Sequence, residues 1–319
     1  MQNSEQEPSE IVMIGLSCKE YRVLVPFALE EFYKGQIYAV SEASKNETGG
    51  GEGVEVVKQE EFRSAKIRPG ETLSGTYTVK IYRIKSKSPW IARKMLPDDA
   101  FVLREDCWNA YPYCKTILTN PNYMGNKFYI IIESMHIEDD GATENALNLP
   151  KELLKKREVI FLNIYDEKYL KETDIRPETN PRIFRSELTG RGPLKENWVE
   201  TTEPVMCCYK VVQVQFKWKG LQGTIEKLTQ KQYPRLFTKF HRETFCWMDR
   251  WYELTTEEIK EIEELTADQL KKQLNDPQKR GIFADDGRAI DRNKSMRNSI
   301  RTTIRKCGFW TLHKSRDSG

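Results

Sequence analysis

Residues 206–218 read MCCYKVVQVQFKW, and their β-branched, aromatic and other apolar residues predict an extended strand. Side chains alternate between the two faces of a strand, so one face carries Met206, Cys208, Lys210, Val212, Val214, Phe216 and Trp218. Lys210 is therefore a cation on an apolar face, where an ammonium group requires an anionic partner. Two partners remain open: a carboxylate of the protein, which is the commoner arrangement, and the phosphate of a ligand.

Further strands are predicted on the N-terminal side of this segment, each bounded by turn residues. They occupy residues 20–27, 54–62, 76–87, 100–108, 111–119, 127–137 and 157–166, and a polar connector occupies about 167–205. Helical periodicity predicts one helix at 28–44 and two more, at 221–251 and 255–275, after the last strand. This order indicates an α+β fold with helices on one face of an antiparallel sheet. The remaining face, if apolar and curved, can line a ligand cavity.

The predicted helices carry apolar stripes and recognisable ends. The stripes consist of Leu29, Phe32, Ile37 and Val40 in the first helix, and of Leu221, Ile225, Leu228, Leu236 and Phe240 in the second. Pro234 lies inside the second helix, where it predicts a local break. Thr255 and Glu258 form a capping-box pattern at the start of the third helix, and Asp276 and Pro277 follow its end.

The composition is that of a globular protein without a nucleic-acid partner. The chain has 319 residues, of which 38% are hydrophobic, and its formal net charge is +3. No apolar run approaches the roughly 20 residues that span a bilayer. Residues 1–18 have the pattern of a flexible leader and not of a secretory signal. The seven cysteines show no framework spacing, so we expect a soluble, cytoplasmic protein with reduced thiols.

Two other segments contain residue types that can bind phosphate. One face of the 76–87 strand carries Thr76, Thr78, Lys80 and Tyr82, which suit a phosphate or a polyol, although such residues more often face solvent. Residues 46–53 read NETGGGEG and lack the Gly-Lys-Ser/Thr ending of a phosphate-binding loop. A flexible surface loop is therefore predicted there.

The sequence predicts neither a metal centre nor a catalytic set. The histidines His136, His241 and His313 are not spaced as metal ligands with one another or with a cysteine. No Cys-x-x-Cys occurs, and the adjacent Cys207 and Cys208 point to opposite faces of a strand. We expect no metal, no cofactor and no enzymatic activity.

Five segments, in order and within about residues 19–275, resemble the small, single-domain phosphatidylinositol transfer proteins. They are EASKNETGGGEGVEV (42–56), CWNAYPYCKT (107–116), LTGRGPL (188–194), MCCYKVVQVQFKWKGLQ (206–222) and RLFTKFHRETFCWMDRW (235–251). The resemblance implies a START-like helix-grip fold, in which a curved antiparallel sheet and long helices enclose one phospholipid beneath a C-terminal lid helix. It implies three parts: a leader at 1–18, the lipid-transfer domain at 19–275 and a basic tail at 276–319.

The resemblance also implies a site for the lipid head group. The matching positions are Gln36, Thr78, Lys80, Asn109, Cys114, Thr116, Ser134, Lys210 and Glu263, with Ser134 standing where the family has threonine. Lys210 is expected near the phosphate, which would supply the anion that its strand face requires. The inositol hydroxyls are expected to bond to Thr78, Lys80, Asn109 and Glu263. Cys114 matches a cysteine that the family links with phosphatidylcholine loading.

The implied function is that of a monomeric carrier, not an enzyme, that exchanges one phosphatidylinositol or phosphatidylcholine molecule between membranes. Some thirty methylenes exposed to water cost about 25 kcal/mol, so a carrier must enclose the acyl chains. The alternative is a sensor or presenter that delivers phosphatidylinositol to a lipid kinase or adaptor with little bulk transfer. Both functions require the same cavity and a transient contact with a membrane surface.

Three features concern the membrane and regulation. The family's membrane-contact loop carries two adjacent tryptophans, whereas this chain has Trp218 and Lys219, which predicts more dependence on anionic lipid. Ser186 matches a regulatory phosphorylation position, but Glu187 follows it, so an ordinary loop serine is the alternative. The tail has an apolar stripe (Met296, Ile300, Ile304) beside a cationic one (Arg297, Arg301, Arg305). This pattern is typical of a membrane-surface helix, with a solvated tail as the alternative.

Overall fold

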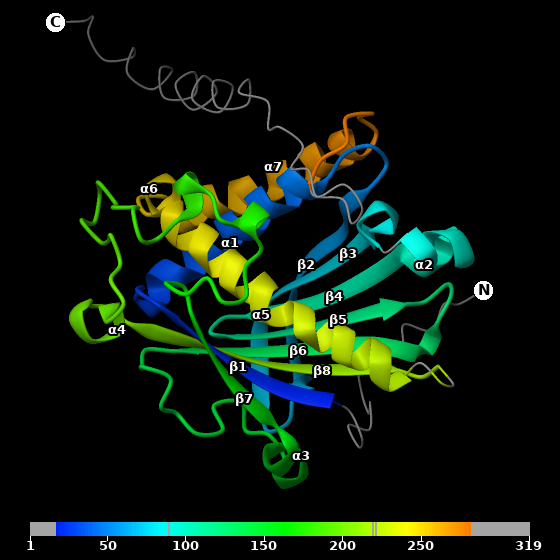
Figure 1. Cartoon of the computed structure of the whole chain (residues 1–319), viewed down its shortest axis with the longest axis horizontal. Helices are drawn as coiled ribbons and strands as arrows, with labels where there is room; N and C mark the ends of the chain where they lie inside the picture. The colour runs from blue at the N-terminus through cyan, green and yellow to red at the C-terminus, as the bar shows by residue number, and fades with distance from the viewer. Residues whose placement is uncertain (1–16, 89, 219, 221, 282–319) are drawn as a thin grey trace, which may run out of the picture. The chain divides into compact units, whose positions relative to one another are not determined.

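A computed structural model describes residues 17–88, 90–218, 220 and 222–281. In this part of the chain one sheet of eight strands has the order β2-β3-β4-β5-β6-β8-β1-β7 (Figure 1). The strands are β1 Ser17–Val25, β2 Gly53–Arg68, β3 Glu71–Arg83, β4 Val102–Ala110, β5 Tyr113–Asn120, β6 Gly125–Ile137, β7 Glu158–Asn163 and β8 Met206–Phe216. Neighbouring strands are antiparallel except for β1 and β7, which are parallel. The α+β prediction is confirmed, and the parallel pair was not foreseen.

The longer helices lie where the apolar periodicity predicts them. The α-helices are α1 Leu29–Glu47, α2 Trp90–Met95, α3 Lys151–Lys156, α4 Trp198–Thr201, α5 Gln222–Cys246, α6 Met248–Trp251 and α7 Thr256–Leu274. Short 3-10 turns occupy Lys85–Lys87, Asp98–Phe101, Glu172–Asp174 and Pro177–Thr179. Thr255 caps α7 through the predicted box, because its hydroxyl accepts from the Glu258 N–H while the Glu258 carboxylate accepts from the Thr255 N–H. Helix α5 packs on β8 and β1, and α7 packs on β2 and α1 (Figure 1).

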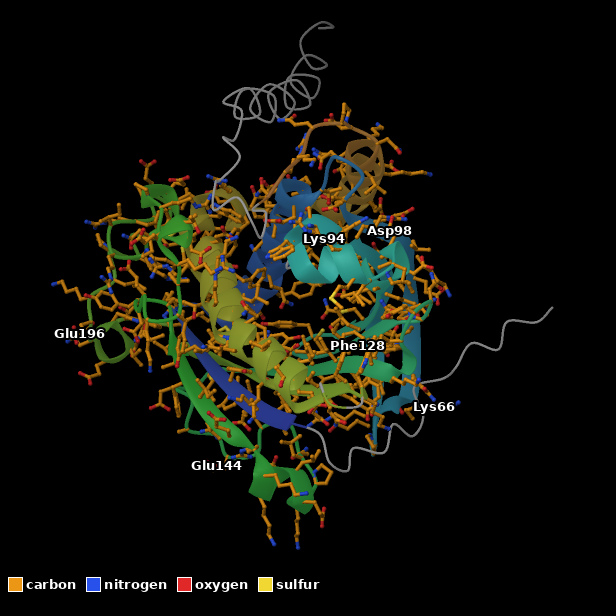
Figure 2. The ribbon with its side chains drawn as sticks, turned by 45° about the vertical axis from the view of Figure 1, so that its right-hand side comes forward. Lys66, Lys94, Asp98, Phe128, Glu144 and Glu196 are labelled. Carbon is orange, nitrogen blue, oxygen red and sulfur yellow. The ribbon has the colours of Figure 1, made fainter. Side chains whose placement is uncertain are left out.

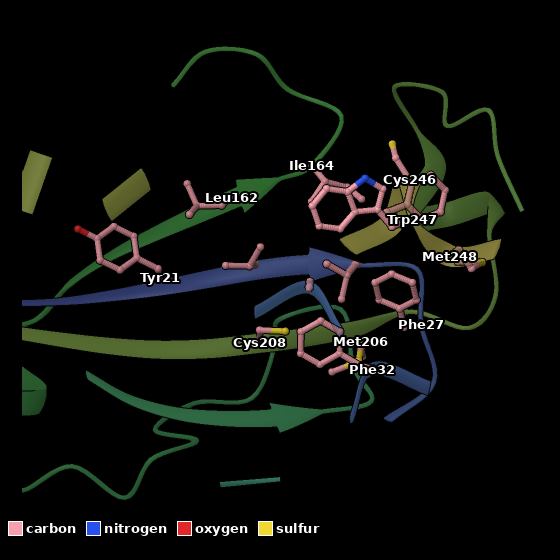
Figure 3. Packing of buried hydrophobic residues seen from close by; sticks show 14 of the residues in the cluster. Tyr21, Phe27, Phe32, Leu162, Ile164, Met206, Cys208, Cys246, Trp247 and Met248 are labelled. Carbon is pink, nitrogen blue, oxygen red and sulfur yellow. The ribbon is translucent and has the colours of Figure 1, made fainter. Parts of the chain in front are cut away.

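The main core lies between α1, α5, α6 and the β1–β8 part of the sheet. Tyr21, Phe27, Phe32 and Met206 are buried there together with Trp251 (Figure 3 shows all of these except Trp251 with labels). The Trp251 indole also donates to the Thr244 carbonyl at 3.0 Å. These contacts hold the helical layer on the sheet through apolar burial.

Helix α5 continues through Pro234, so the predicted break is wrong. Proline lacks the N–H that would bond to the carbonyl four residues earlier, which belongs to Gln230. The buried Tyr21 hydroxyl from β1 lies 3.1 Å from that carbonyl and 3.1 Å from the Gln230 Oε1. A tertiary hydrogen bond therefore takes the place of the helical one.

Replacing Tyr21 by phenylalanine should lower the free energy of unfolding by about 1–3 kcal/mol, because a fully buried hydroxyl loses its bonds to Gln230. Urea denaturation followed by tryptophan fluorescence measures this change. Pro234→Ala restores a helical N–H, so the cost of Tyr21→Phe should shrink in that background. Equal costs in both backgrounds would show that the hydroxyl does not substitute for the missing N–H.

The predicted apolar stripes are partly wrong. Val40, Leu228 and Leu236 are exposed. The side of α5 that faces the sheet instead includes polar residues whose side chains bond to the β8 backbone: the Glu226 carboxylate accepts from the Phe216 N–H, and the Gln230 amide donates to the Val212 carbonyl. These bonds set the rotation of α5 on the sheet, which hydrophobic spacing alone could not reveal.

The glycine-rich loop packs against the chain that follows α7, contrary to the prediction of a flexible surface loop. The N–H groups of Gly50 and Gly51 donate to the carbonyls of Asp276 and Leu274 at 2.6 and 3.0 Å. A Cβ atom at Gly49 would lie 2.3 Å from the Gln278 carbonyl oxygen, so the close approach requires glycine. Contacts of the folded part thus include residues just beyond 275, the domain limit that the sequence predicts.

Candidate functional site

The strand residues of the predicted head-group site all project from one face of the sheet. Lys210 pairs with Tyr21, and Tyr21 contacts Gln230 and Phe237 of α5, so this is the face that the helices cover. Alternation along the paired strands places the remaining members on the same face: Thr78, Lys80, Asn109, Cys114, Thr116 and Ser134. The site therefore lies between the sheet and the helices and not on the face that they leave free.

On this face a polar row crosses five strands. Consecutive direct partners in the register are Lys210, Ser134, Cys114, Asn109 and Thr76. Directly paired residues on adjacent strands bring their side chains within about 5 Å of each other. Residues that are almost 80 positions apart in the sequence, such as Lys210 and Ser134, thus become neighbours.

A second polar group, at the β3–β4 end of the face, contains an ion pair. The Lys80 Nζ lies 3.3 Å from the Glu105 carboxylate, which also accepts from the Tyr82 hydroxyl at 2.9 Å. Burial opposes the charge on Lys80, but Glu105, Tyr82 and Cys107 together outweigh it and raise the pKa of the ammonium group. Thr78 lies on the same face, two residues before Lys80 in β3.

Beyond the polar row, the β6 and β8 part of the helix-covered face is apolar and extends to the end of the sheet at which β8 terminates. Its members pair across β8, β6 and β5: Val212 with Ile132, Val214 with Ile130, Ile130 with Leu118, and Phe216 with Phe128. Trp218, which is exposed, stacks on Phe216 at that end with ring centroids 6.0 Å apart. Strand β3 ends and β4 begins at the same end of the sheet, so α2 between them lies there too, with Trp90 and Met95 exposed. Figure 2 labels Phe128 on the sheet, and Lys94 and Asp98 in the α2 region.

Lys210 has no carboxylate partner among the described residues. Its Nζ lies 3.4 Å from the Ser134 hydroxyl and 5.5 Å from the centre of the Phe237 ring, and no carboxylate oxygen of the described chain comes within 4.0 Å. The commoner of the two alternatives, an ion pair within the protein, is therefore not what the structure contains. A half-buried ammonium group without a counter-ion is suited to an anionic ligand.

Two histidines lie within electrostatic reach of this ammonium group. The Nδ1 atoms of His136 and His241 lie 2.9 and 2.7 Å from the carbonyls of Pro112 and Phe237, so each Nδ1 carries the proton. Burial and then the Lys210 charge lower the pKa of both rings, to about 3 for His241. Both imidazoles are consequently neutral at pH 7, and their Nε2 atoms are buried acceptors without a partner in the described structure.

The polar side chains on this face retain some solvent-accessible surface although the helices cover them. The side chains of Lys80 and Glu105 remain 16% and 12% exposed. The Asn109 Oδ1 is buried and has no hydrogen-bond partner within the described residues. Because buried polar atoms are normally bonded, this unfilled acceptor beside accessible polar groups indicates an interior space that can take a polar ligand.

The two helical members of the predicted site lie on α1 and α7. Burial raises the pKa of Glu263, while the Lys80 charge lowers it, so the carboxylate is within electrostatic reach of the β3 lysine. Burial and then Glu263 raise the pKa of Tyr33 on α1. Gln36 is half-buried about one turn further along α1. The helices thus bring Glu263 to the Lys80 end of the sheet, whereas among the described residues no hydrogen bond joins Gln36 to the other members.

Sequence reasoning missed Glu105, His136 and His241 as members of this environment. Glu105 could have been found by pairing the 76–87 and 100–108 strands, because it faces Lys80 directly. His136 could have been found in the same way, because the β6–β8 register pairs it with Cys208, on the same face as Lys210. His241 carried no such indication, since its place depends on the packing of α5.

The remaining predicted positions lie away from the head-group site. Ser186 is buried, and its hydroxyl donates to Asp249 and accepts from the Thr189 N–H at 3.0 Å. Lys219 lies outside the described residues, as does the amphipathic tail pattern at 296–305. In the part of the chain that the structure describes, no three metal-ligating side chains come together as a metal site, and no helix is long and apolar enough to cross a membrane.

A largely antiparallel sheet gripped by long helices, with polar and apolar side chains on the face between them, defines a helix-grip protein. A sequence profile described as phosphatidylinositol transfer protein matches residues 16–268. The human phosphatidylinositol transfer protein beta isoform is 44% identical over 268 residues, which cover 82% of this chain and 95% of that protein. Phosphatidylinositol transfer protein 1 of Dictyostelium discoideum is 42% identical over 264 residues, which cover 81% of this chain and 96% of that protein. The chain belongs to the phosphatidylinositol transfer protein family.

Proposed function

We propose that this protein holds one phosphatidylinositol or phosphatidylcholine molecule between its sheet and its helices and exchanges it between membranes. The observation that carries the proposal is Lys210, a half-buried cation without a carboxylate partner in the described structure, at the head of a row of polar side chains. A phosphodiester is common to both lipids and supplies the negative charge that the ammonium group lacks. Family membership supports the same ligand class.

The order of the side chains along the sheet gives the bound lipid a direction. Beyond the polar row that begins at Lys210, apolar pairs of β8, β6 and β5 extend to the end of the strands marked by Trp218. The head group in this proposal lies at the polar row, and the acyl chains run toward Trp218. Enclosing some thirty methylenes replaces an exposure to water of about 25 kcal/mol, which is the barrier that a carrier must lower.

The inositol and choline head groups require different side chains at the polar end of the site. The hydroxyls of inositol need donors and acceptors, and the proposed ones are Thr78, Lys80, Glu105, Asn109 and Glu263. The trimethylammonium of choline donates no such bonds, so its lipid depends on the phosphate contact at Lys210 and on Cys114, Thr116 and Ser134 nearby. Gln36 is proposed to reach the phosphate from α1.

The end of the sheet at which β8 terminates, beside Trp218, is proposed as the transient membrane contact. Trp218, Trp90 and Met95 are exposed apolar side chains at this end, and Lys94 lies 5.1 Å from the Trp90 ring. Aromatic and cationic side chains together suit the interface of an anionic bilayer. No bond is made or broken in this cycle, so the proposed function requires no catalytic group.

The full-length chain, purified and analysed by native mass spectrometry, should carry one diacyl phospholipid per monomer. In a vesicle-to-vesicle assay with labelled lipids, it should transfer phosphatidylinositol and phosphatidylcholine in proportion to protein concentration. Saturable binding with negligible transfer would favour the sensor or presenter, and the absence of bound lipid after incubation with either vesicle would refute the proposal.

A further inference from the structure

Two thiols meet inside the site on the β4–β5 hairpin. The Sγ atoms of Cys107 and Cys114 lie 3.7 Å apart, and both cysteines are free and incompletely buried. Cys107 pairs with Thr116, and Cys114 pairs with Asn109, so the cysteines are diagonal neighbours on one face of adjacent strands. A disulfide bond of about 2.05 Å requires the sulfur atoms to approach by about 1.6 Å.

The surroundings make the two thiols unequal. The interaction with Cys107 and the nearby Lys210 charge lower the pKa of the Cys114 thiol, and burial opposes them. The interaction with Cys114 and then burial raise the pKa of the Cys107 thiol well above its usual value. Cys114 is thus the better source of a thiolate, and Cys107 is a neutral thiol within its reach.

We propose that Cys107 and Cys114 form a reversible disulfide that switches the polar end of the site between a lipid-loading and a non-loading state. The oxidant is a small peroxide such as hydrogen peroxide, and the reductant is a cellular dithiol or thiol. The formation of the bond rests on the geometry of the hairpin alone, whereas its effect on lipid rests on the proposed function.

The chemistry balances in two steps. The Cys114 thiolate attacks one oxygen of hydrogen peroxide, the O–O bond breaks, and the products are a sulfenic acid and hydroxide. The Cys107 sulfur then attacks the Cys114 sulfur, the S–O bond breaks, and water leaves with the thiol proton as the disulfide forms. Two electrons pass from the two thiols to the peroxide, and a dithiol returns them on reduction.

The disulfide would alter the site because both sulfurs face the interior. Cys114 stands in the polar row between Ser134 and Asn109, and Cys107 stands opposite Thr116 in the next row. The bond would fix both side chains against each other and remove a thiol from the space beside the head group. Cys207 and Cys208 offer no comparable pair, since adjacent residues on a strand point to opposite faces.

The bond can be detected in one tryptic peptide, because residues 105–115 contain both cysteines between Arg104 and Lys115. The full-length, lipid-loaded protein is treated with hydrogen peroxide, blocked with N-ethylmaleimide, digested and analysed by mass spectrometry. The peptide should be two hydrogen atoms lighter and unlabelled, and treatment with dithiothreitol before blocking should give two labels. Two labels after peroxide, or a sulfinic acid at Cys114 beside a labelled Cys107, would overturn the proposal. The Cys107→Ala variant is the matched control and should never yield the lighter peptide.

The switch itself is tested by native mass spectrometry of lipid loading from phosphatidylcholine and phosphatidylinositol vesicles. Oxidised protein should load at least about fivefold more slowly than reduced protein, and dithiothreitol should restore the rate. A disulfide that forms without changing the loading rate would overturn the switch. If reduced protein loads no lipid, the proposed function fails, and the mass of the 105–115 peptide still decides whether the disulfide exists.

Discussion

Lys210→Met is expected to lower the transfer of both phosphatidylinositol and phosphatidylcholine by at least about thirtyfold. Removing one partner of a charge pair in a desolvated site costs about 2–5 kcal/mol of binding free energy. Each 1.4 kcal/mol corresponds to about a tenfold change in affinity. The ammonium group has no carboxylate partner in the described structure, so the phosphate is the counter-ion at risk. Transfer between labelled vesicles, at matched protein concentration, measures the loss.

The free energy of unfolding of the Lys210→Met variant should rise or stay unchanged. Removal of a half-buried charge relieves desolvation, and methionine keeps most of the side-chain volume. Lys195→Met is the matched control, because Lys195 is exposed in the connector before α4, away from the polar row and from the proposed membrane contact. Normal transfer by Lys210→Met, or an equal loss in Lys195→Met, would show that Lys210 is not the phosphate group's partner.

Asn109→Leu is expected to separate the two lipids. Transfer of phosphatidylinositol should fall about tenfold, since a site built to bond hydroxyls loses one of its buried polar groups. Transfer of phosphatidylcholine should stay within about twofold, because its choline head does not use that acceptor. Leucine has nearly the shape of asparagine, so the fold should tolerate it.

The stability of this variant provides an independent check. The Asn109 Oδ1 is buried without a partner in the described part of the protein, so its removal should not lower the free energy of unfolding. Competition between the two labelled lipids in one assay makes each variant its own control. An equal loss for both lipids would contradict the assignment of Asn109 to the inositol ring.

Most of the fold could be predicted from local patterns. Alternation placed strands at 76–87 and 206–218, close to β3 and β8, and the capping box placed the start of α7. These features depend on residues a few positions apart, which hydrophobic spacing and hydrogen-bonding side chains report directly. The same local view misjudged Pro234, because the hydrogen bond that replaces the missing helical one comes from Tyr21, more than two hundred residues away.

The site could be predicted in part. Periodicity predicted that Lys210 lies on an apolar strand face and that Thr78 and Lys80 share a face. The resemblance to a known family supplied the other positions. Neither could decide whether a carboxylate meets Lys210, because that depends on every element packed against its face. Glu105 and Cys107 joined the site only when β4 was paired in register with β3 and β5.

The amino-acid sequence by itself determined which side chains share a face of each strand and where the helices begin, since both follow from the repeat of the backbone. Only the tertiary structure decided which strands are neighbours, which cation lacks a counter-ion and which two thiols meet. The physical reason is that strand register and helix rotation are set by contacts between distant segments, so that a slip of one residue would turn every one of these side chains to the opposite face.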